Sequence, residues 1–474
     1  MAEIRPFRGL RFDPTRVHLG TVVCPPFDVI SPEEQQALHA RDPHNVVRLE
    51  LSLGATDLSA PDNRYARAAA TLDRWQREGI LVRDEQPAIY LYEHQFQHAG
   101  RPATRRGLLV AGRLHDWSEG QVLPHERTRE GPKQDRLALL RATRVNTSPL
   151  WLLYDDSDRA VATALAEVWT TPPLAVAETP GERHLLRMVT DPAALRRLVE
   201  AFASRPLFIA DGHHRYETAL FFRDEQRRAT LARGESLDPE AGYEFALMLL
   251  VALDDPGLVI LPNHRLVRRL GRSPLALRHD LERWFVLRPI ELPASGPAGI
   301  PAAGDSDEAI GQAIEQALAH APAPDAAGDG AAHRFGFYDG TAAWLLWPRA
   351  DVDWRAELPP DHTAAWKELD VAILDALVIR DVCGIRAEAE AAHAGATSHA
   401  AEDRLAYVAS AAEAVRAVRH GEAEAAFLLR ATRLDQLCAV ALAGDRMPPK
   451  STFLVPKPVT GLVLHPLDGR RPRP

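Results

Sequence analysis

The chain has 474 residues, of which 46% are hydrophobic and 26% charged, and its formal net charge at pH 7 is -9. This composition is typical of globular proteins rather than disordered chains, and the length predicts two or three compact domains. The net negative charge argues against a broad nucleic-acid-binding surface, because such a surface needs clustered positive charge.

The first half of the chain predicts alternating helices and strands. Ser31 followed by Pro32 is a favourable helix start, so a helix is expected over residues 32–41. Helical apolar spacing that stops at Gly79 predicts a second helix over 65–75. A hairpin is expected from residues 88–96 and 106–114. The remaining expected elements are strands over 150–154 and 207–210 and helices over 137–141, 193–203 and 215–233.

The second half contains a compositional break. Residues 293–332 are rich in Ala, Gly, Pro and Asp, which predicts a variable segment that could hold a helix over 310–318. Residues 245–253 fit a buried strand or a buried helix. Beyond the break we expect a hairpin over 334–337 and 343–347, a buried helix over 371–379, and strands over 425–429, 452–455 and 461–464.

These elements predict an α/β or α+β fold of mixed sheets with flanking helices. The expected segments are an N-terminal α+β region (1–235), a connecting α/β segment (236–292), the variable segment (293–332) and a C-terminal α+β region (333–474) that completes the site. Three widely separated cysteines favour a reducing compartment, and neither a signal peptide nor a run of about 18 apolar residues is visible. We therefore expect a cytoplasmic protein without a membrane or nucleic-acid partner, while its oligomeric state stays open.

The segment LFIADGHHRYETAL (207–220) is the most informative, because a buried strand, a glycine turn and a helix start follow one another directly. The amide groups and dipole at a helix start bind phosphate or carboxylate. Gly212 would allow a ligand to approach the backbone, and Arg215 could grip an anion through two hydrogen bonds. Asp211 could hold a divalent cation, accept a proton, or simply cap the helix with His213 and His214 solvated.

A second cluster, LPHERTREGPKQDR (123–136), predicts a site loop. His125 or Glu126 could act as a general base toward a hydroxyl, and Arg127 or Lys133 could neutralise phosphate charge. Thr128 belongs to the same predicted binding loop. A charged exposed loop without a ligand is the alternative.

A third cluster, MPPKST, places Lys450, Ser451 and Thr452 where they could contact an anionic ligand, with Lys457 further on. It lacks the glycines and amide donors of a P-loop, and a plain strand entry is the alternative. Weaker candidates are Asp28 in CPPFD and the Asn263-His264-Arg265 run. The motifs of zinc proteases, serine hydrolases and dinucleotide-binding folds are absent, so those functions lose support.

Six segments in order resemble the bacterial and archaeal domain-of-unknown-function 1015 family over nearly the whole chain. They are IRPFRGLR, CPPFDVIS, HERT with a downstream DR, ADGHHRYETA, LPNHR and MPPKSTF. The DGHHR turn is also similar to the phosphate-binding turn of the ParB and sulfiredoxin-like superfamily, which includes free-serine kinases. That resemblance implies a ParB-like portion near residues 90–235. It also implies metal binding or catalysis by Asp211 and phosphate binding by Gly212, His213, His214 and Arg215.

The sequence is compatible with three functions. The first is phosphoryl transfer to or from a small metabolite or nucleotide, of kinase or phosphatase type, with ATP or ADP and a divalent metal such as Mg²⁺ as cofactors. The acidic charge and the absence of a cysteine beside the turn favour this chemistry over the other superfamily functions. A loose association of the family with serine biosynthesis favours a phosphorylated amino acid or its precursor. The alternatives are a non-catalytic nucleotide- or metabolite-binding regulator, and a metal-dependent hydrolase that uses His125, Glu126, His213 and His214.

Overall fold

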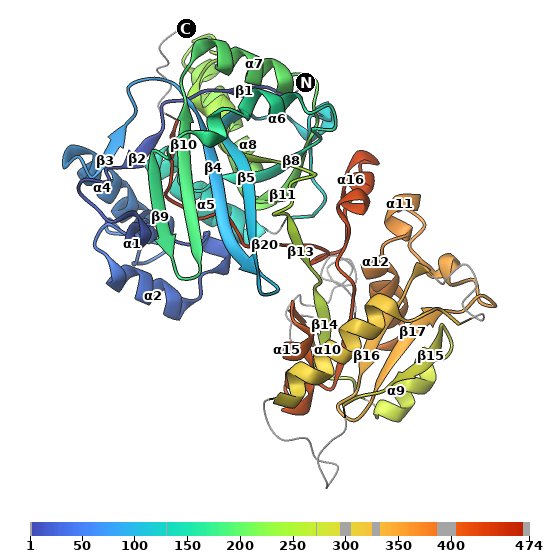
Figure 1. Cartoon of the computed structure of the whole chain (residues 1–474). Coiled ribbons are helices and arrows are strands. Elements are labelled where there is room, and N and C mark those ends of the chain that lie inside the picture. Colours follow the sequence, from blue (N-terminus) through green and yellow to red (C-terminus); the bar gives the residue numbers. More distant parts are fainter. Residues whose placement is uncertain are drawn as a thin grey trace. The chain divides into compact units, whose positions relative to one another are not determined.

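The computed structural model describes residues 2–128, 130–271, 273–293, 305–324, 332–385 and 404–467. The chain divides into two compact units (Figure 1). Unit 1 comprises Met1–Val259 and Pro456–Pro474, and unit 2 comprises Ile260–Val455. Residues 236–259 therefore belong with the N-terminal region, and the end of the chain returns to unit 1 after completing unit 2.

Unit 1 is built on a mixed nine-stranded sheet in the order β6-β11-β8-β12-β5-β4-β10-β9, with β1 also paired to β5. The β11–β6 and β12–β8 pairs are parallel, whereas β1–β5, β4–β5, β4–β10, β9–β10, β8–β11 and β5–β12 are antiparallel. The strands are β1 (Ile4–Arg5), β4 (Ile89–His98), β5 (Arg101–Arg113), β6 (Val122–Leu123), β8 (Leu150–Tyr154), β9 (Ala175–Thr179), β10 (Glu182–Val189), β11 (Leu207–Asp211) and β12 (Phe245–Ala252).

The two faces of this sheet carry different side chains. Helices α6 (Ala160–Leu165), α7 (Pro192–Phe202) and α8 (His213–Ala232) share a hydrophobic core with alternate strand residues such as Leu91 and Leu108. The intervening residues, among them Tyr92 and His94, point to the opposite face because successive strand side chains alternate. Residues from both ends of the chain cover that face: the Gly9 amide donates to the Tyr90 hydroxyl, and a side chain at position 9 would also meet Val463.

The rest of unit 1 consists of short elements. The helices are α1 (Leu19–Val22), α2 (Pro32–Arg41), α3 (Val47–Glu50), α4 (Arg64–Arg77) and α5 (Glu130–Thr143), with 3-10 turns η1 (Phe27–Val29), η2 (Trp117–Glu119), η3 (Val168–Thr170) and η4 (Gly242–Glu244). Strand β2 (Leu10–Phe12) pairs with β3 (Leu81–Arg83), and β7 (Val145–Asn146) pairs with β21 (His465–Pro466). Of these, α1, α2, α3, α4, β2, β3 and β7 contribute to a second core around Trp75 and Phe12.

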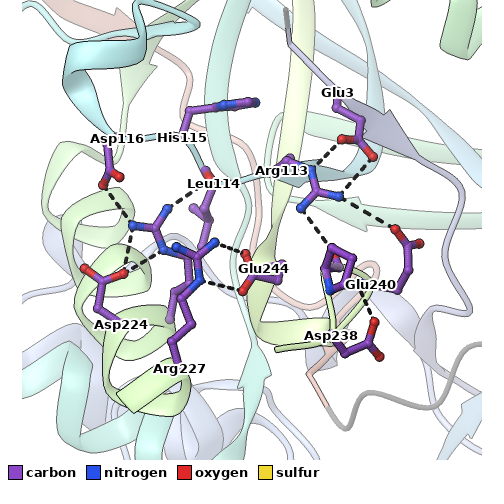
Figure 2. Close-up of polar contacts among 12 residues, drawn as sticks. Glu3, Arg113, Leu114, His115, Asp116, Asp224, Arg227, Asp238, Glu240 and Glu244 are labelled. Carbon is purple, nitrogen blue, oxygen red and sulfur yellow. Dashed lines mark hydrogen bonds and ion pairs between the residues drawn. The ribbon is translucent and has the colours of Figure 1, made fainter. Parts of the chain in front are cut away.

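An ion-pair network anchors the middle of α8 (Figure 2). Arg227 on α8 makes two hydrogen bonds to the buried carboxylate of Glu244, and Arg223 bonds Asp116 and the Leu114 carbonyl. In the same view Arg113 pairs with Glu3 and Glu240 at the adjoining end of β5. Because α8 is fixed against the sheet at this point, its first turn also has a defined position.

Unit 2 is an antiparallel six-stranded sheet in the order β15-β17-β16-β19-β14-β18. Its strands are β14 (His264–Val267), β15 (Phe285–Ile290), β16 (Phe335–Tyr338), β17 (Ala343–Pro348), β18 (Leu405–Val408) and β19 (Ala425–Leu428), while β13 (Val259–Leu261) pairs separately with β20 (Phe453–Val455). Helices α10 (Asp305–His320) and α15 (Ala411–Arg419) pack on the sheet through a shared core. The others are α9 (Pro274–Leu281), η6 (Trp354–Glu357), α11 (Ala364–Lys367), α12 (Asp370–Leu374), the π-helical turn η7 (Asp375–Val382) and α16 (Leu434–Leu442).

The structure confirms the mixed α/β class and most expected elements. Helix α2 has the expected bounds, with the Ser31 hydroxyl accepting from the Glu34 amide and proline in the first turn. The ambiguous segment 245–253 is strand β12, and most of the expected segment 293–332 other than α10 lies outside the described residues. The strand predicted over 461–464 is wrong: Gly461 has φ 102°, and only Leu464 makes an isolated bridge, to Leu10. Among the described residues, no helix is long and apolar enough to cross a membrane.

Candidate functional site

The DGHHR segment forms the expected strand, turn and helix start in unit 1. Strand β11 ends at Asp211, Gly212 adopts the left-handed conformation with φ 101° and ψ 26°, and α8 begins at His213. A Cβ atom on Gly212 would lie 3.1 Å from Leu150 and 3.2 Å from Arg215, so both backbone conformation and space favour glycine. Glycine has no side chain with which to cap the first amides of α8, in contrast to the usual N-cap residues.

Asp211 lies between two cations. Its Oδ2 accepts a hydrogen bond from Arg215 Nη2 at 2.6 Å, and its Oδ1 lies 2.7 Å from Lys457 Nζ. Lys457 also pairs with Asp28, so four charged groups from three distant segments form one chain of contacts. Burial alone would raise the pKa of Asp211, but the charges of Lys457 and Arg215 outweigh it and hold the pKa below its ordinary value. Burial likewise opposes the charge on Lys457, yet Asp211 and Asp28 raise the pKa of the ammonium group.

Lys457 is the principal residue of this cluster that sequence reasoning did not select. The weak candidate Asp28 proves to be its second partner. A compositional signal was present: the chain has 56 lysines and arginines, of which only four are lysines, at positions 133, 367, 450 and 457. In a chain that uses arginine so heavily, each lysine was a candidate for a specific role.

The Arg215 guanidinium already has hydrogen-bond partners within the protein, unlike an arginine that is available to bind an anion. Besides Asp211, its guanidinium donates to the Pro149 carbonyl and, at 3.2 Å, to the Ser148 hydroxyl. A cavity of about 50 Å³ lies beside it, lined also by Arg136 and Glu50. Such a volume is enough for ordered water rather than for a metabolite. The predicted bidentate grip of a phosphate by Arg215 would therefore require it to exchange internal partners.

Residues 125–128 of the predicted loop 123–136 lie against the first turns of α8, whereas residues 130–136 are not loop but the start of helix α5. The His125 amide donates to His213 Nε2 at 3.3 Å, and the two rings meet edge to face with centroids 4.6 Å apart. Since Nε2 accepts, a neutral His213 carries its proton on Nδ1, which faces Glu126 Oε2 at 3.8 Å. The Glu126 side chain is 35% exposed, whereas His125 is only 1% exposed. Of the two expected bases, Glu126 is the one open to a substrate.

Glu217 on α8 contacts Thr128 of the loop and Lys133 of α5. Its Oε2 accepts from the Thr128 hydroxyl at 2.5 Å and lies 3.2 Å from Lys133 Nζ. Arg127 is exposed, and His214 is half-buried. The structure thus brings the first two predicted clusters together in unit 1, with Glu217 as a bridging residue that the sequence interpretation missed.

The third predicted cluster belongs to unit 2. The Lys450 and Pro449 carbonyls accept from Arg265, which is completely buried and makes two 3.0 Å bonds to Asp375. Ser451 is buried and donates to the Pro448 carbonyl at 2.6 Å. These contacts show how the MPPKST turn is held within unit 2. A contribution of Lys450, Ser451 and Thr452 to the Asp211 cluster remains a prediction.

Residues 4–372 match the family described as "Protein of unknown function (DUF1015)". The chain belongs to this DUF1015 family. The match includes every segment of the unit 1 site except the one that carries Lys457. None of the curated proteins matches this DUF1015 chain.

Solved structures with some likeness include "Free serine kinase in complex with AMP", at 12% identity and a TM-score of 0.29, covering 71% of this chain and 84% of that one. A "Conserved hypothetical protein from Pyrococcus furiosus" has 12% identity and a TM-score of 0.30, covering 72% of this chain and 92% of that one. Likeness at this level assigns no activity to this chain.

Proposed function

We propose that this DUF1015 protein binds a nucleotide or another small phosphorylated metabolite beside Asp211 and transfers a phosphoryl group to or from a small metabolite. The observation that carries the proposal is the half-buried Asp211, held between Lys457 and Arg215 at the glycine-started N-terminus of α8. Phosphoryl transfer depends mainly on positioning and charge neutralisation, and this cluster offers cations, a carboxylate and helix amides in one place.

The charge balance of the cluster favours a metal-bound nucleotide over free phosphate. Asp211 and Asp28 carry two negative charges and Lys457 and Arg215 two positive charges, so the side chains alone give little net attraction for a phosphate dianion. The positive end of the α8 dipole adds a fraction of one charge. A Mg²⁺ ion that arrives with the nucleotide would supply the missing positive charge and take a carboxylate oxygen as ligand. For Asp211 to be that ligand, as we propose, Lys457 must give up or share its place at Oδ1.

The loop beside α8 supplies the proposed proton-transfer group. Glu126 is partly exposed and faces the Nδ1 proton of the buried His213. In the proposed reaction Glu126 accepts the proton of the attacking hydroxyl, while His213 orients the carboxylate. Arg127 is exposed on this loop and Lys133 lies near the start of α5, and both would neutralise phosphate charge. His125, being buried, serves to hold His213 rather than to meet the substrate.

The test is phosphorus NMR of the full chain incubated with Mg²⁺, ATP and serine, and in the reverse direction with ADP and phosphoserine. Catalytic conversion by the wild type and its loss in Asp211→Asn support the proposal. Glu225→Gln is the matched control, because Glu225 lies later on α8 and pairs with Arg141 on the surface. Conversion that is unchanged in Asp211→Asn would contradict the assignment of the centre.

A regulator that only binds its ligand is the second candidate, and the engagement of Arg215 by internal partners favours it. Such a protein would bind nucleotide in calorimetry and show no turnover in the same NMR experiment. The metal-dependent hydrolase is less well supported. Among the described residues, the ligand atoms close enough together to hold a metal ion belong to His94, Glu182 and His184. Within the same part of the chain, the expected set around His125 and His213 is not arranged in this way.

A further inference from the structure

A row of buried polar side chains crosses three neighbouring strands of the unit 1 sheet. In the strand register His184 on β10 lies opposite His94 on β4, and His94 lies opposite Arg105 on β5. Both histidines are 0% exposed and Arg105 is 1% exposed. Burying such groups is costly unless each is hydrogen-bonded, so their partners indicate what the row does.

Arg105 fixes the proton position on His94. A guanidinium can only donate, so the 3.0 Å contact between Arg105 Nη2 and His94 Nδ1 makes Nδ1 the acceptor. Burial, followed by the charge of Arg105, lowers the pKa of His94 to about 2, so the ring is neutral at physiological pH. Its one proton is therefore on Nε2, where it is donated to Glu182 Oε2 at 2.9 Å.

This proton assignment argues against a metal ion in the same place. One ligand atom from each of His94, Glu182 and His184 lies within 4.8 Å of the others, which by itself suits a divalent cation. Coordination by His94 Nε2 would, however, move its proton to Nδ1 and point it at the guanidinium of Arg105. The buried charge of Arg105 would also repel a second cation. The row is therefore a hydrogen-bonded structure.

Arg105 contacts one neighbour of each member of the Asp211–Lys457 pair. Its Nη2 group donates to the carbonyl of Pro456, the residue before Lys457, at 2.7 Å. Its guanidinium also stacks on the Trp151 ring at 4.1 Å, and Trp151 is the strand partner of Asp211 in the β8–β11 pair. One buried group thus touches the backbone that carries the lysine and the strand neighbour of the carboxylate.

Tyr92 gives the lysine segment a second attachment. Its hydroxyl hydrogen-bonds to the backbone of Val459 and, at 2.8 Å, to His184 Nδ1. Pro456 and Val459 flank Lys457 on either side, so the row holds the segment before and after the lysine. These two attachments restrain the backbone from which the Lys457 side chain extends.

We propose that Arg105, oriented by the neutral His94, is a positioning residue that holds Lys457 on Asp211. Arg105 does not touch the substrate in this scheme; it acts through the Pro456 carbonyl and the Trp151 ring. The significance of the pair for phosphoryl transfer rests on the proposed function, but the positioning itself is a property of the unliganded protein and can be measured without a ligand.

The small number of lysines makes a direct measurement possible. With ¹³C-labelled lysine, the four side chains give few signals, and Lys457→Arg identifies the one of interest. We expect the ¹³Cε order parameter of Lys457 in the wild type to exceed that of the half-buried Lys367. In Arg105→Met it should fall to the Lys367 value. Arg187→Met is the control. It also removes a buried arginine, which lies on β10, donates to the Thr171 carbonyl and lies over the Trp169 ring.

Two substitutions of His94 test the proton assignment. The Oδ1 atom of His94→Asn can replace the Nδ1 acceptor that faces Arg105, so the order of Lys457 should be kept. His94→Gln keeps a donor toward Glu182 but removes that acceptor, so the order should be lost. An ordered Lys457 in Arg105→Met, an equal response to both His94 substitutions, or stoichiometric metal in the purified protein that is lost in His94→Gln would each overturn the proposal. Absence of turnover in the wild type would instead refute the proposed function and leave these results valid.

Discussion

A double-mutant cycle on Lys457 and Asp211 measures how strongly the central pair is coupled. The variants are Lys457→Met, Asp211→Asn and the combination. The Lys457 side chain is 12% exposed and that of Asp211 19%, so the pair lies between exposed pairs and fully buried pairs. Exposed pairs contribute about 0–1 kcal/mol and breaking a buried pair costs about 3–5 kcal/mol, so we expect a coupling of about 2 kcal/mol. Asp28 is 36% exposed, so the expected coupling energy counts only the Lys457–Asp211 contact and not the contact of Lys457 with Asp28.

Because the chain has two units, local stability is the appropriate measurement. Amide hydrogen exchange of peptides from β11 and β12 reports the opening of unit 1, and a 2 kcal/mol change corresponds to roughly 30-fold faster exchange. Each single variant should show this acceleration, and the combination should add little. Additive effects of the two substitutions would refute the coupling.

The pH dependence of the coupling follows from the directions of the two pKa shifts. Asp211 has a lowered pKa in the folded state, so its contribution is present above its ordinary pKa of 3.8 and is lost as the pH falls through the folded value. Lys457 has a raised pKa, so its contribution is present below its ordinary pKa of 10.5 and is lost as the pH rises through the folded value. The coupling should therefore be constant from about pH 5 to pH 9. A coupling that changes steadily across that range would show that other groups dominate.

Three further substitutions test the surroundings. Glu244→Gln should destabilise unit 1 by about 2 kcal/mol, because it removes the charge of a buried carboxylate that pairs with Arg227 on α8. The control Glu240→Gln, at a 44% exposed position, should cost under about 0.5 kcal/mol. Equal amide exchange rates of the α8 peptides in these two variants would contradict the prediction. Gly212→Ala should lower the free energy of unfolding by more than the roughly 1–2 kcal/mol expected for a left-handed backbone alone. It should also cost more than Gly100→Ala, because Gly100 has a positive φ but open space around it. Equal losses of thermal stability in the two variants would show that the turn at Gly212 can relax. Asp375→Asn should destabilise unit 2 by about 3 kcal/mol, since its partner arginine is 0% exposed, and unchanged exchange in β14 would refute that.

The sequence predicted those parts of the fold that depend on local patterns. The serine-proline start of α2 and the apolar run of β8 were recognisable because capping and hydrophobic periodicity act within a few residues. The strand at 461–464 was predicted from apolar content alone, and it failed because Gly461 turns the backbone and only Leu464 finds a partner. The DGHHR turn was identified correctly as a strand, a glycine turn and a helix start.

The contacts of the site were less accessible, because they depend on tertiary structure. Lys457 contacts Asp211, although the two residues are 246 positions apart in the sequence and unit 2 lies between them along the chain. Likewise, His94 and His184 become neighbours only through the register of β4 and β10. Alternation along each strand shows that both side chains can share a face, but no local pattern specifies which strands pair. The rarity of lysine in the chain was the one signal available for Lys457.

The most direct test of the central claim is calorimetric titration of ADP and ATP, with and without Mg²⁺, into the full-length wild type, Lys457→Met and the control Lys367→Met. The Asp211–Lys457 centre predicts binding by the wild type that requires Mg²⁺, unchanged binding by Lys367→Met, and affinity at least about tenfold weaker in Lys457→Met, equivalent to about 1.4 kcal/mol. Equal affinity in all three proteins, or no nucleotide binding by the wild type, would contradict it.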